Sequence, residues 1–242
     1  MRLFGKNPVI ERIKVNPKSI RKIYIQTGHP DSAYIRKKAR KWGIVVYGVP
    51  QAKILKITRN LNSQGIVADV EDFQYMDYSD LLDQAKKKGL SLLFLDNLKD
   101  PQNLGAIIRS IACLGDFAIV LPKKESVGVT ETVFRVASGG DNYVLISRVP
   151  NLSSAIAIAK NQGFWIVGSV VEGGEDLLEK PLPFPIGLVV GSEQKGIRDV
   201  VKKQIDIKIT IPMKQPRLSL NAAQATTILC YEIAKQKNKK SR

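Results

Sequence analysis

The sequence predicts an α/β protein in which a larger domain, built on a parallel sheet with helices on both faces, follows a smaller α/β domain. Two observations predict this class. From residue 91 onward, short and nearly continuous apolar runs alternate with stretches of helical periodicity, which is typical of parallel strands buried on both faces. Within residues 1–75, shorter strand and helix patterns alternate between turn residues. We therefore expect a domain at 1–75, a polar linker at 76–90 and a second domain at 91–242.

The strand–loop–helix pattern at residues 92–115 organises the second domain. Leu92–Leu95 has the length and composition of a buried strand, and the breaker Asp100-Pro101 and the candidate helix cap Asn103 follow it. Apolar residues then recur at helical spacing up to Gly115: Leu104, Ile107, Ile108, Ile111 and Leu114. Arg109 interrupts this apolar face. Because open α/β sheets bind ligands at the carboxyl ends of their strands, the loop is a candidate site.

The same patterns predict the remaining elements. In the second domain we expect strands at 118–121, 143–147, 165–170, 187–190 and 205–211. Helices are expected at 130–136, 153–162 and 197–203, with a last helix that begins at Ser219. In the first domain, strands are expected at 21–26, 43–49 and 65–70, and helices at 32–42 and 52–59. Such an alternation indicates a compact α/β sandwich.

The composition is ordinary for a globular protein, with 44% hydrophobic and 25% charged residues among 242. No apolar run approaches the length of a membrane span, and the first residues lack a signal peptide's apolar stretch, so we expect a cytoplasmic protein without a membrane segment. Cys113 and Cys230 lie on apolar helical patterns and are expected to be buried, reduced thiols. The single histidine, His29, excludes His-rich zinc sites, and no metal is expected.

Positive charge is the strongest global feature. The 38 Lys and Arg residues exceed the 22 Asp and Glu residues by 16, and residues 1–90 hold +10 of this excess, from 18 basic and 8 acidic groups. Such a field favours nucleic acid; solubility or an anionic membrane surface is the alternative. The helix expected at 32–42 carries basic residues near three aromatic ones, which suits an RNA surface, although a solvated face would look the same. The candidate RNA-binding residues are Arg36, Lys37, Arg40 and Lys41.

The common catalytic fingerprints are missing from the sequence. It has no G-x-x-x-x-G-K-[ST] loop for nucleoside triphosphates, no dinucleotide-binding G-x-G-x-x-G, no G-x-S-x-G elbow and no metal-spaced His/Cys set. The common hydrolases and dehydrogenases are therefore disfavoured.

Three other stretches share one form, an apolar run or breaker followed directly by polar residues. They are Asp100–Arg109, LVVGSEQKG at 188–196, and the segment 209–221, which ends in RLSLN. Each is weak alone: Ser219 could simply cap a helix, 191–196 could be an ordinary turn, and Arg109 could form a structural ion pair with Glu193. Together they bring amide, guanidinium, carboxylate and hydroxyl groups to one edge of one sheet, which indicates a site.

These stretches also carry a resemblance to a known family. DPQNLGAIIRS, VVGSEQKG and IPM…RLSLNAAQA resemble, in order and spacing, motifs one, two and three of the SpoU (TrmH-type) branch of the SPOUT RNA methyltransferases. Residues 5–72 are similar to the family's substrate-binding domain, which is ribosomal-protein-L30e-like. VASGGDNYVLISRVPNL and GFWIVGS resemble the RlmB-like subgroup, which methylates a guanosine ribose in large-subunit ribosomal RNA.

The resemblance implies transfer of a methyl group from S-adenosyl-L-methionine to a ribose 2′-oxygen, with 23S ribosomal RNA as substrate. It also implies a C-terminal trefoil knot and a homodimer in which the last helix packs against its mate. Backbone groups would hold the cofactor, at Gly191, Ile211, Met213, Leu220, Ser138 and Gly140. A transfer RNA 2′-O-methyltransferase is the first alternative, and a non-catalytic RNA-binding or ribosome-assembly protein is the second.

Carried over by motif, the active set is Asn103, Arg109, Glu193, Ser219 and Asn221. The family's proposed role for Arg109 is to activate the ribose hydroxyl. Because a guanidinium group stays protonated in proteins, we expect Arg109 instead to hold an RNA phosphate and stabilise the developing 2′-oxyanion. Glu193 would orient Arg109, and the other three residues would fix the loop and the substrate.

Overall fold

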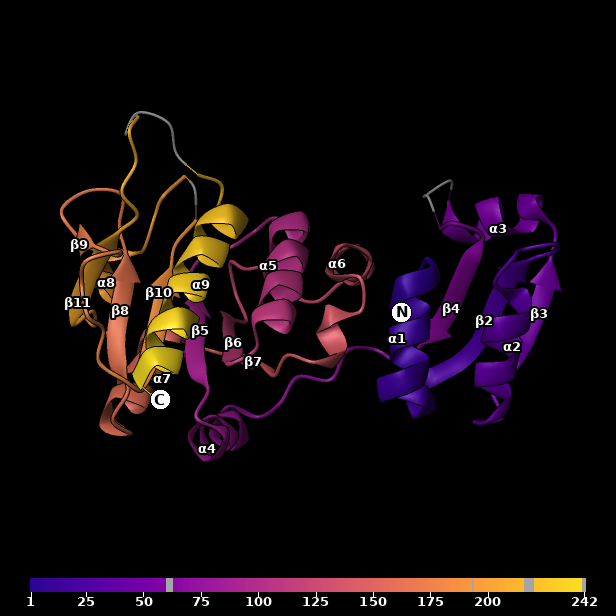
Figure 1. Ribbon diagram of the computed structural model, residues 1–242, viewed down its shortest axis with the longest axis horizontal. Helices are drawn as coiled ribbons and strands as arrows, with labels where there is room; N and C mark the ends of the chain where they lie inside the picture. Colours follow the sequence, from indigo (N-terminus) through magenta and orange to yellow (C-terminus); the bar gives the residue numbers. More distant parts are fainter. Residues whose placement is uncertain (60–62, 193, 216–219, 241–242) are drawn as a thin grey trace. The chain divides into compact units, whose positions relative to one another are not determined.

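The computed structural model describes residues 1–59, 63–192, 194–215 and 220–240. The chain divides into two compact units, each with its own sheet (Figure 1). The first unit contains residues 1–74 and 129–143, and the second contains residues 75–128 and 144–242. Both are α/β units, so the predicted fold class is confirmed.

The first unit combines elements from two segments of the chain. They are β1 (Arg2–Phe4), α1 (Lys6–Val15), the 3₁₀ helix η1 (Pro17–Ser19), β2 (Ile20–Gln26), α2 (Ser32–Arg40), β3 (Val46–Val49), α3 (Gln51–Thr58) and β4 (Ile66–Val70), with α6 (Glu131–Ala137) and the 3₁₀ helix η2 (Gly140–Asn142) from the later segment. The sequence prediction misses β1, α1 and η1. Pro8 interrupts the helical pattern of α1, but it lies in the first turn, where proline is tolerated.

The described part of the first unit has a four-stranded sheet in the order β1-β4-β2-β3. β4 is antiparallel to β1 and β2, whereas β2 and β3 are parallel. Side chains alternate across a strand, so Phe4, Val49 and Val67 share one face, where they form a small core with Ile54 of α3. α2 lies on the opposite face, because a Cβ at Gly48 would lie 3.2 Å from a guanidinium nitrogen of Arg36.

Residues 129–143 complete the core of the first unit. Phe134 of α6 is fully buried, and its ring centroid lies 5.2 Å from Cζ of Arg12 in α1. Arg12 forms a buried ion pair with Asp141 (Nη2–Oδ2 2.5 Å) and donates to Ser19 Oγ at 3.2 Å. The predicted ranges 1–75 and 91–242 assign this segment to the other domain. Its apolar pattern carries no signal of which core it joins.

The second unit holds the longer run of alternating strands and helices. Its elements are α4 (Tyr78–Lys88), β5 (Ser91–Leu95), α5 (Pro101–Leu114), β6 (Phe117–Pro122), β7 (Ile146–Val149), α7 (Leu152–Asn161), β8 (Trp165–Ser169), β9 (Glu175–Asp176), β10 (Ile186–Val190), α8 (Asp199–Lys202), β11 (Ile207–Thr210) and α9 (Ala222–Lys240). Its described residues form a seven-stranded sheet in the order β7-β6-β5-β10-β8-β11-β9. All neighbouring pairs are parallel, as predicted.

Helices cover both faces of this sheet. Leu92 and Phe94 of β5 point to the face where α4, α7 and α8 contribute a common core with the strands. Leu93 and Leu95 point to the other face, where α5 and α9 pack against each other (Figure 1). The sheet is therefore buried on both sides, which explains the continuous apolar runs of its strands.

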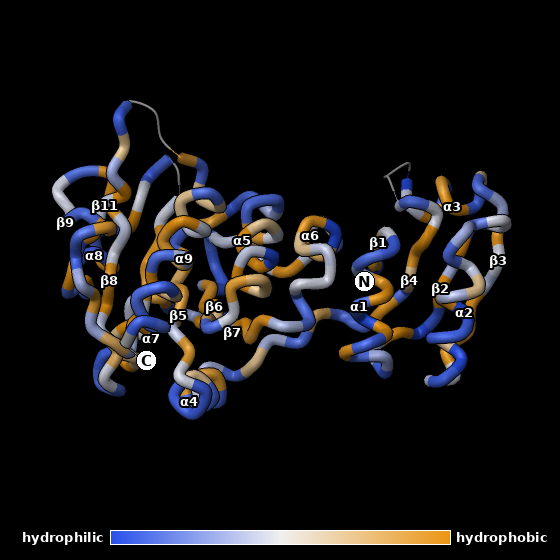
Figure 2. Tube along the Cα trace, viewed as in Figure 1, coloured by the Kyte–Doolittle hydropathy of each residue, from blue (hydrophilic) through white to orange (hydrophobic). Residues whose placement is uncertain are grey.

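α4 corrects the prediction of a linker at 76–90. Leu81, Leu82 and Ala85 are buried in the core of the second unit. Most residues of α4 are hydrophilic, and its few apolar residues lie on one side (Figure 2). This composition is why the sequence pattern predicts a polar linker. The segment is thus an integral helix rather than a connection.

Several element ends also differ from the prediction. α5 begins at Pro101, not after Asn103, because the Asp100 carboxylate accepts a hydrogen bond from the Gln102 N–H at 2.8 Å and caps the helix. α9 begins at Ala222, and Ser219 lies outside the described residues. The strand expected at 143–147 is β7 at Ile146–Val149, and β9, which has two residues, is not predicted.

The two cysteines lie in different environments. Cys230 in α9 is fully buried, as predicted, and burial raises the pKa of its thiol. Cys113 is exposed, contrary to the prediction, because the buried face of α5 ends at Ile111.

Candidate active site

The carboxyl ends of three neighbouring strands, β10, β8 and β11, surround a pocket of ≈ 320 Å³ in the second unit. Its lining comes from the segments after these strands and from the start of α9: Ser169, Val170, Val171, Val190, Gly191, Ser192, Gln194, Gly196, Thr210, Ile211, Met213, Leu220, Ala222 and Ala225. The lining is largely apolar side chains and glycine, and the volume is at the lower end of the roughly 300–1,000 Å³ of small-molecule sites. The sheet edge therefore holds a pocket whose size suits a small molecule.

Gly191 and Gly196 shape the loop that follows β10. The Gly196 N–H donates to the Ser192 carbonyl at 2.8 Å, which closes a tight turn, and Gly196 has a φ of +61°. A Cβ at Gly191 would lie 2.1 Å from the carbonyl carbon of Gly196, so a larger residue does not fit. Because glycine has no side chain, main-chain atoms line the pocket at both positions.

An ion pair that the sequence prediction misses fastens this loop to β5. Asp96, fully buried directly after β5, accepts hydrogen bonds from the Arg198 N–H and Nε, both at 2.8 Å, and its Oδ1 lies 2.7 Å from Arg198 Nη2. The Asp96 N–H donates to the Val190 carbonyl at 2.8 Å. These contacts hold both ends of the Val190–Arg198 segment at the sheet edge. The only signal in the sequence is an aspartate after an apolar strand, since its partner is 102 residues away.

Two of the predicted active-site residues, Asn103 and Asn221, are in contact. Asn221 Nδ2 donates to Asn103 Oδ1 at 2.9 Å and so joins the first turn of α5 to the start of α9. Asn221 also caps α9, because its Oδ1 accepts from the Gln224 N–H at 2.9 Å while its own N–H donates to Gln224 Oε1 at 3.4 Å. The capping bonds orient the Asn221 amide toward Asn103.

Asn103 also lines a second cavity of ≈ 410 Å³ in the same unit. The two cavities adjoin, since Ser192 and Gln194 line both. The remaining lining of the second is mainly polar: Asn97, Lys99, Asp100, Glu125 and Lys195. An apolar pocket beside a polar cavity is an arrangement that brings a small molecule and a polar second substrate together.

Arg109 is exposed on α5 and forms no hydrogen bond or ion pair with the residues that the structure describes. It lines neither cavity. The predicted pairing with Glu193, like the role of Ser219, concerns residues outside the described ranges.

The residues predicted to hold the cofactor divide between the two units. Gly191, Ile211, Met213 and Leu220 line the ≈ 320 Å³ pocket. Ser138 and Gly140 belong to the first unit and line neither cavity: Ser138 ends α6 in the left-handed conformation with φ +53°, and Gly140 begins η2. Only the resemblance supported these two residues.

The predicted RNA-binding residues lie together on the first unit. All four are exposed, three on α2 and one directly after it: Arg36, Lys37, Arg40 and Lys41. Arg36 is held in place, because its Nη1 donates to the Val46 carbonyl of β3 at 2.9 Å. The cluster therefore presents positive charge to solvent on the face of the sheet that α2 covers.

Neither a metal centre nor a membrane helix is found in the described part of the chain. No group of three or more His, Cys, Asp or Glu side chains there is arranged to hold a metal ion. None of the helices there has both the length and the apolar character that crossing a membrane requires.

The fold and the site define an α/β protein whose parallel sheet carries a largely apolar pocket beside a polar cavity, with an additional α/β unit. The chain belongs to the SpoU rRNA Methylase family, whose profile matches residues 90–231. Residues 2–76 match a second profile, described as RNA 2′-O ribose methyltransferase substrate binding. It is thus a member of a family of RNA methyltransferases, which use S-adenosylmethionine, and the predicted family is confirmed.

Two relatives, one of nearly equal length and one longer, carry names of the same kind. A Bacillus subtilis protein named as a TrmH family tRNA/rRNA methyltransferase is 35% identical over 240 residues, which is 98% of this chain and 96% of that protein. A tRNA/rRNA methyltransferase of Synechocystis is 37% identical over 240 residues, or 97% of this chain, and the chain spans 62% of that protein's length.

Solved structures show the same fold. The AdoMet-bound rRNA methyltransferase from Sinorhizobium meliloti is 25% identical, with a TM-score of 0.80 over 98% of this chain and 87% of that one. The SpoU methyltransferase AviRb from Streptomyces viridochromogenes, solved with AdoMet, is 22% identical, with a TM-score of 0.80 over 99% of this chain and 91% of that one.

Proposed function

We propose that the protein transfers a methyl group from S-adenosylmethionine to the 2′-oxygen of an RNA ribose. The observation that carries this proposal is the pair of adjoining cavities beside the bonded residues Asn103 and Asn221. The match of residues 2–76 to a profile described for RNA 2′-O ribose methyltransferases supports the ribose as the acceptor.

The apolar pocket fits the cofactor. When bound, S-adenosylmethionine supplies a methyl group activated by a positively charged sulfur. Ile211 and Leu220 would offer apolar surface to its adenine, and main-chain groups at Gly191 would offer hydrogen bonds. Binding of this kind requires no charged side chain, which explains why the sequence lacks a nucleotide fingerprint.

Positioning supplies much of the rate in such a transfer. The ribose 2′-oxygen would bond to the methyl carbon as the carbon–sulfur bond breaks, and the hydroxyl proton would pass to an oxygen of an RNA phosphate. Arg109, exposed and without a described partner, would hold that phosphate and stabilise the charge that develops on the 2′-oxygen. Asn103 and Asn221 would hold the α5 loop against α9 while this occurs.

The proposed substrate is a guanosine of large-subunit (23S) ribosomal RNA. This rests on the resemblance of residues 136–152 and 163–169 to the RlmB-like subgroup. The relatives are named for both tRNA and rRNA, so a transfer RNA is the second candidate. Lys37, Arg40 and Lys41 would contact the RNA backbone.

Methyl incorporation from labelled S-adenosylmethionine into purified ribosomal and transfer RNAs, and into ribosomal particles, tests the proposal. We expect a single 2′-O-methylguanosine in 23S RNA. Methylation of a transfer RNA instead would support the proposed chemistry but identify transfer RNA as the substrate. Cofactor binding without label in any RNA or particle would favour a non-catalytic RNA-binding or ribosome-assembly protein.

We further propose a homodimer that forms through α9. Two large apolar side chains of this helix, Ile228 and Tyr231, are 39% and 59% exposed, one turn apart. Ala223 and Ala234 are buried within the unit instead. Light scattering should show a dimer for the wild-type protein and a monomer for Ile228→Asp/Tyr231→Asp; a wild-type monomer would refute the assignment.

Two other expectations remain proposals. The family's C-terminal trefoil knot stays a prediction, and a crystal structure of the protein would test it. A cytoplasmic location accords with an RNA substrate, and cell fractionation would test it.

A further inference from the structure

A cavity of ≈ 620 Å³ in the first unit gathers cationic side chains that the proposed function does not use. It lies beside β1, the start of β2, the end of β4 and the carboxyl end of α3. Its charged lining residues are Arg2, Arg21, Lys22, Arg59, Asp69 and Glu131. These side chains, four cationic and two acidic, carry a net charge of +2, and the Met1 ammonium group, also in the lining, pairs with Asp72.

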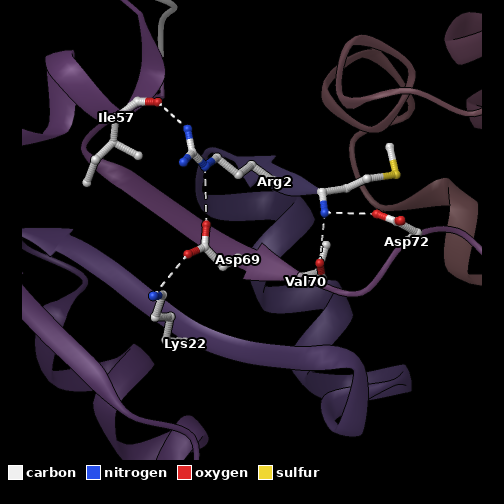
Figure 3. Close-up of polar contacts among 7 residues, drawn as sticks. Arg2, Lys22, Ile57, Asp69, Val70 and Asp72 are labelled. Atoms are coloured by element: carbon white, nitrogen blue, oxygen red, sulfur yellow. Dashed lines mark hydrogen bonds and ion pairs between the residues drawn. The ribbon is translucent and has the colours of Figure 1, made fainter.

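One carboxylate serves two of the cations (Figure 3). Arg2 Nε lies 3.3 Å from Asp69 Oδ1, and Lys22 Nζ lies 3.6 Å from Asp69 Oδ2. Arg2 Nη1 also donates to the Ile57 carbonyl at 2.7 Å, so its guanidinium is held at the carboxyl end of α3. The side chains of Arg2 and Lys22 remain 41% and 42% exposed, and a second anion can therefore reach them.

The other two cations of the cavity, Arg21 and Arg59, have no counter-ion among the described residues. Arg21 and Arg59 are exposed and form no hydrogen bond or ion pair with the described residues. Arg59 is nevertheless anchored through its backbone: it ends α3 with φ +51°, and its N–H donates to the Leu55 and Lys56 carbonyls. The cavity is thus lined by two guanidinium groups without a described partner and by two cations that share one acid.

The cavity lies on the opposite face of the sheet from α2. Arg2 is two residues before Phe4, Lys22 two before Tyr24, and Asp69 two after Val67, so all three share the face that packs on α3. α2, with Lys37 and Arg40, covers the other face. The cavity is therefore distinct from the predicted RNA-binding surface.

We propose that this cavity binds phosphodiester groups of the RNA substrate, so that the first unit contacts RNA on both faces of its sheet. The proposal rests on the proposed RNA substrate. Guanidinium groups bind phosphate through two parallel hydrogen bonds, and the cations here come from β1, β2 and the carboxyl end of α3, with Arg2 and Lys22 meeting at Asp69. That spread suits an extended polyanion better than a single small anion.

RNA affinity measured across a salt series tests the proposal in the full-length protein. The test variant is Arg21→Gln/Arg59→Gln, and the matched control is Lys86→Gln/Lys87→Gln, which removes the same charge from exposed positions of α4. Each single-strand phosphate contact contributes about 0.7 to the slope of log affinity against log salt. At 0.1 M salt, one contact therefore raises the affinity about fivefold relative to 1 M salt. We expect the RNA affinity of the test variant to fall about 25-fold and the slope of its salt dependence to decrease by about 1.4. The RNA affinity of the control should fall less than about threefold, because salt screens charges that lie far from the RNA.

Asp69→Asn gives a test with the opposite sign. It removes the carboxylate that neutralises Arg2 and Lys22, so RNA affinity should rise about threefold, with thermal unfolding as the check on folding. Unchanged or weaker binding by a folded Asp69→Asn variant would overturn the proposal, as would equal losses in the test and control pairs.

Inorganic phosphate and AMP distinguish a free anion from RNA. Binding of each anion is measured by calorimetry. If Arg21→Gln/Arg59→Gln abolishes the binding of either anion but leaves RNA affinity unchanged, the cavity binds a small anion and the proposal is overturned. A wild-type protein that binds neither ribosomal RNA, transfer RNA nor ribosomal particles would refute the proposed function itself. RNA binding that is indifferent to the cavity variants would refute only this inference.

Discussion

Arg12→Leu should destabilise the first unit by an amount that depends on pH. Asp141 is fully buried, its Oδ2 is paired with Arg12, and its Oδ1 has no hydrogen-bond partner in the described structure. Burial raises the pKa of Asp141 more than the Arg12 guanidinium lowers it. Removing Arg12 leaves a buried carboxyl group without its counter-ion, which typically costs about 3–5 kcal/mol at pH 7.

The sign of the pH dependence follows from the direction of the shift. A carboxyl group with a raised pKa binds its proton more tightly in the folded than in the unfolded state, so stability rises as the pH falls through the folded pKa. Without Arg12 the pKa of Asp141 rises further. Each pH unit between the unfolded and the folded pKa changes the free energy of unfolding by up to about 1.4 kcal/mol. Between pH 7 and pH 5 the variant should therefore recover up to about 2.7 kcal/mol relative to the wild-type protein.

Urea unfolding in a Trp165→Phe background measures this effect, because Trp42 then reports on the first unit alone. Arg12→Leu/Asp141→Leu is the control: replacing both buried charges by apolar groups should restore most of the stability. A loss below about 1 kcal/mol at pH 7, or a loss that is the same at pH 5, would refute the assignment of residues 129–143 to this core.

Four further predictions concern the second unit. Arg109→Ala should leave S-adenosylmethionine affinity within about twofold in calorimetry and lower methyl transfer about 10²–10³-fold, the usual effect of losing one donor to a developing oxyanion; retained turnover would exclude that role. Gly191→Ala should weaken cofactor binding at least about tenfold, because its Cβ would lie 2.1 Å from the Gly196 carbonyl carbon and the loop must move; unchanged affinity would show that the loop does not hold the cofactor. A thiol reagent should modify Cys113 in the folded protein and Cys230 only after unfolding. Because burial raises the pKa of Cys230 above its ordinary 9.0, the unfolded state alone ionises as the pH passes 9.0, and stability should fall there; a flat urea midpoint across that range would contradict this.

The sequence predicts the parts of the fold that depend on local patterns. Continuous apolar runs identify the strands β5, β6, β8 and β10, because each is buried on both faces. It also identifies the loop at Gly191, since tight turns require glycine. α4 is missed because a helix with one narrow apolar side resembles a polar linker.

What the sequence does not predict are contacts between distant residues. Asp100 and Asn103 are both good helix caps, and only the bond to Asn221, 118 residues away, distinguishes the second. Arg12 looks like a surface residue, because buried charges are rare and no local pattern marks them. The pairing of Asp96 with Arg198 is hidden for the same reason.

The discontinuous first unit also sets an order of events while the chain is being made. Its four strands have been synthesised once residue 70 is added, but Phe134 and Asp141 follow 64 and 71 residues later. At about 5–20 residues per second, Asp141 is added roughly 4–14 s after the last strand of this sheet, and Arg12 lacks its counter-ion throughout that interval. A nascent chain stalled near residue 75 should therefore be far more sensitive to protease than one stalled beyond residue 180. A gene fragment cut at the apparent domain boundary would encode a module that lacks part of its own core.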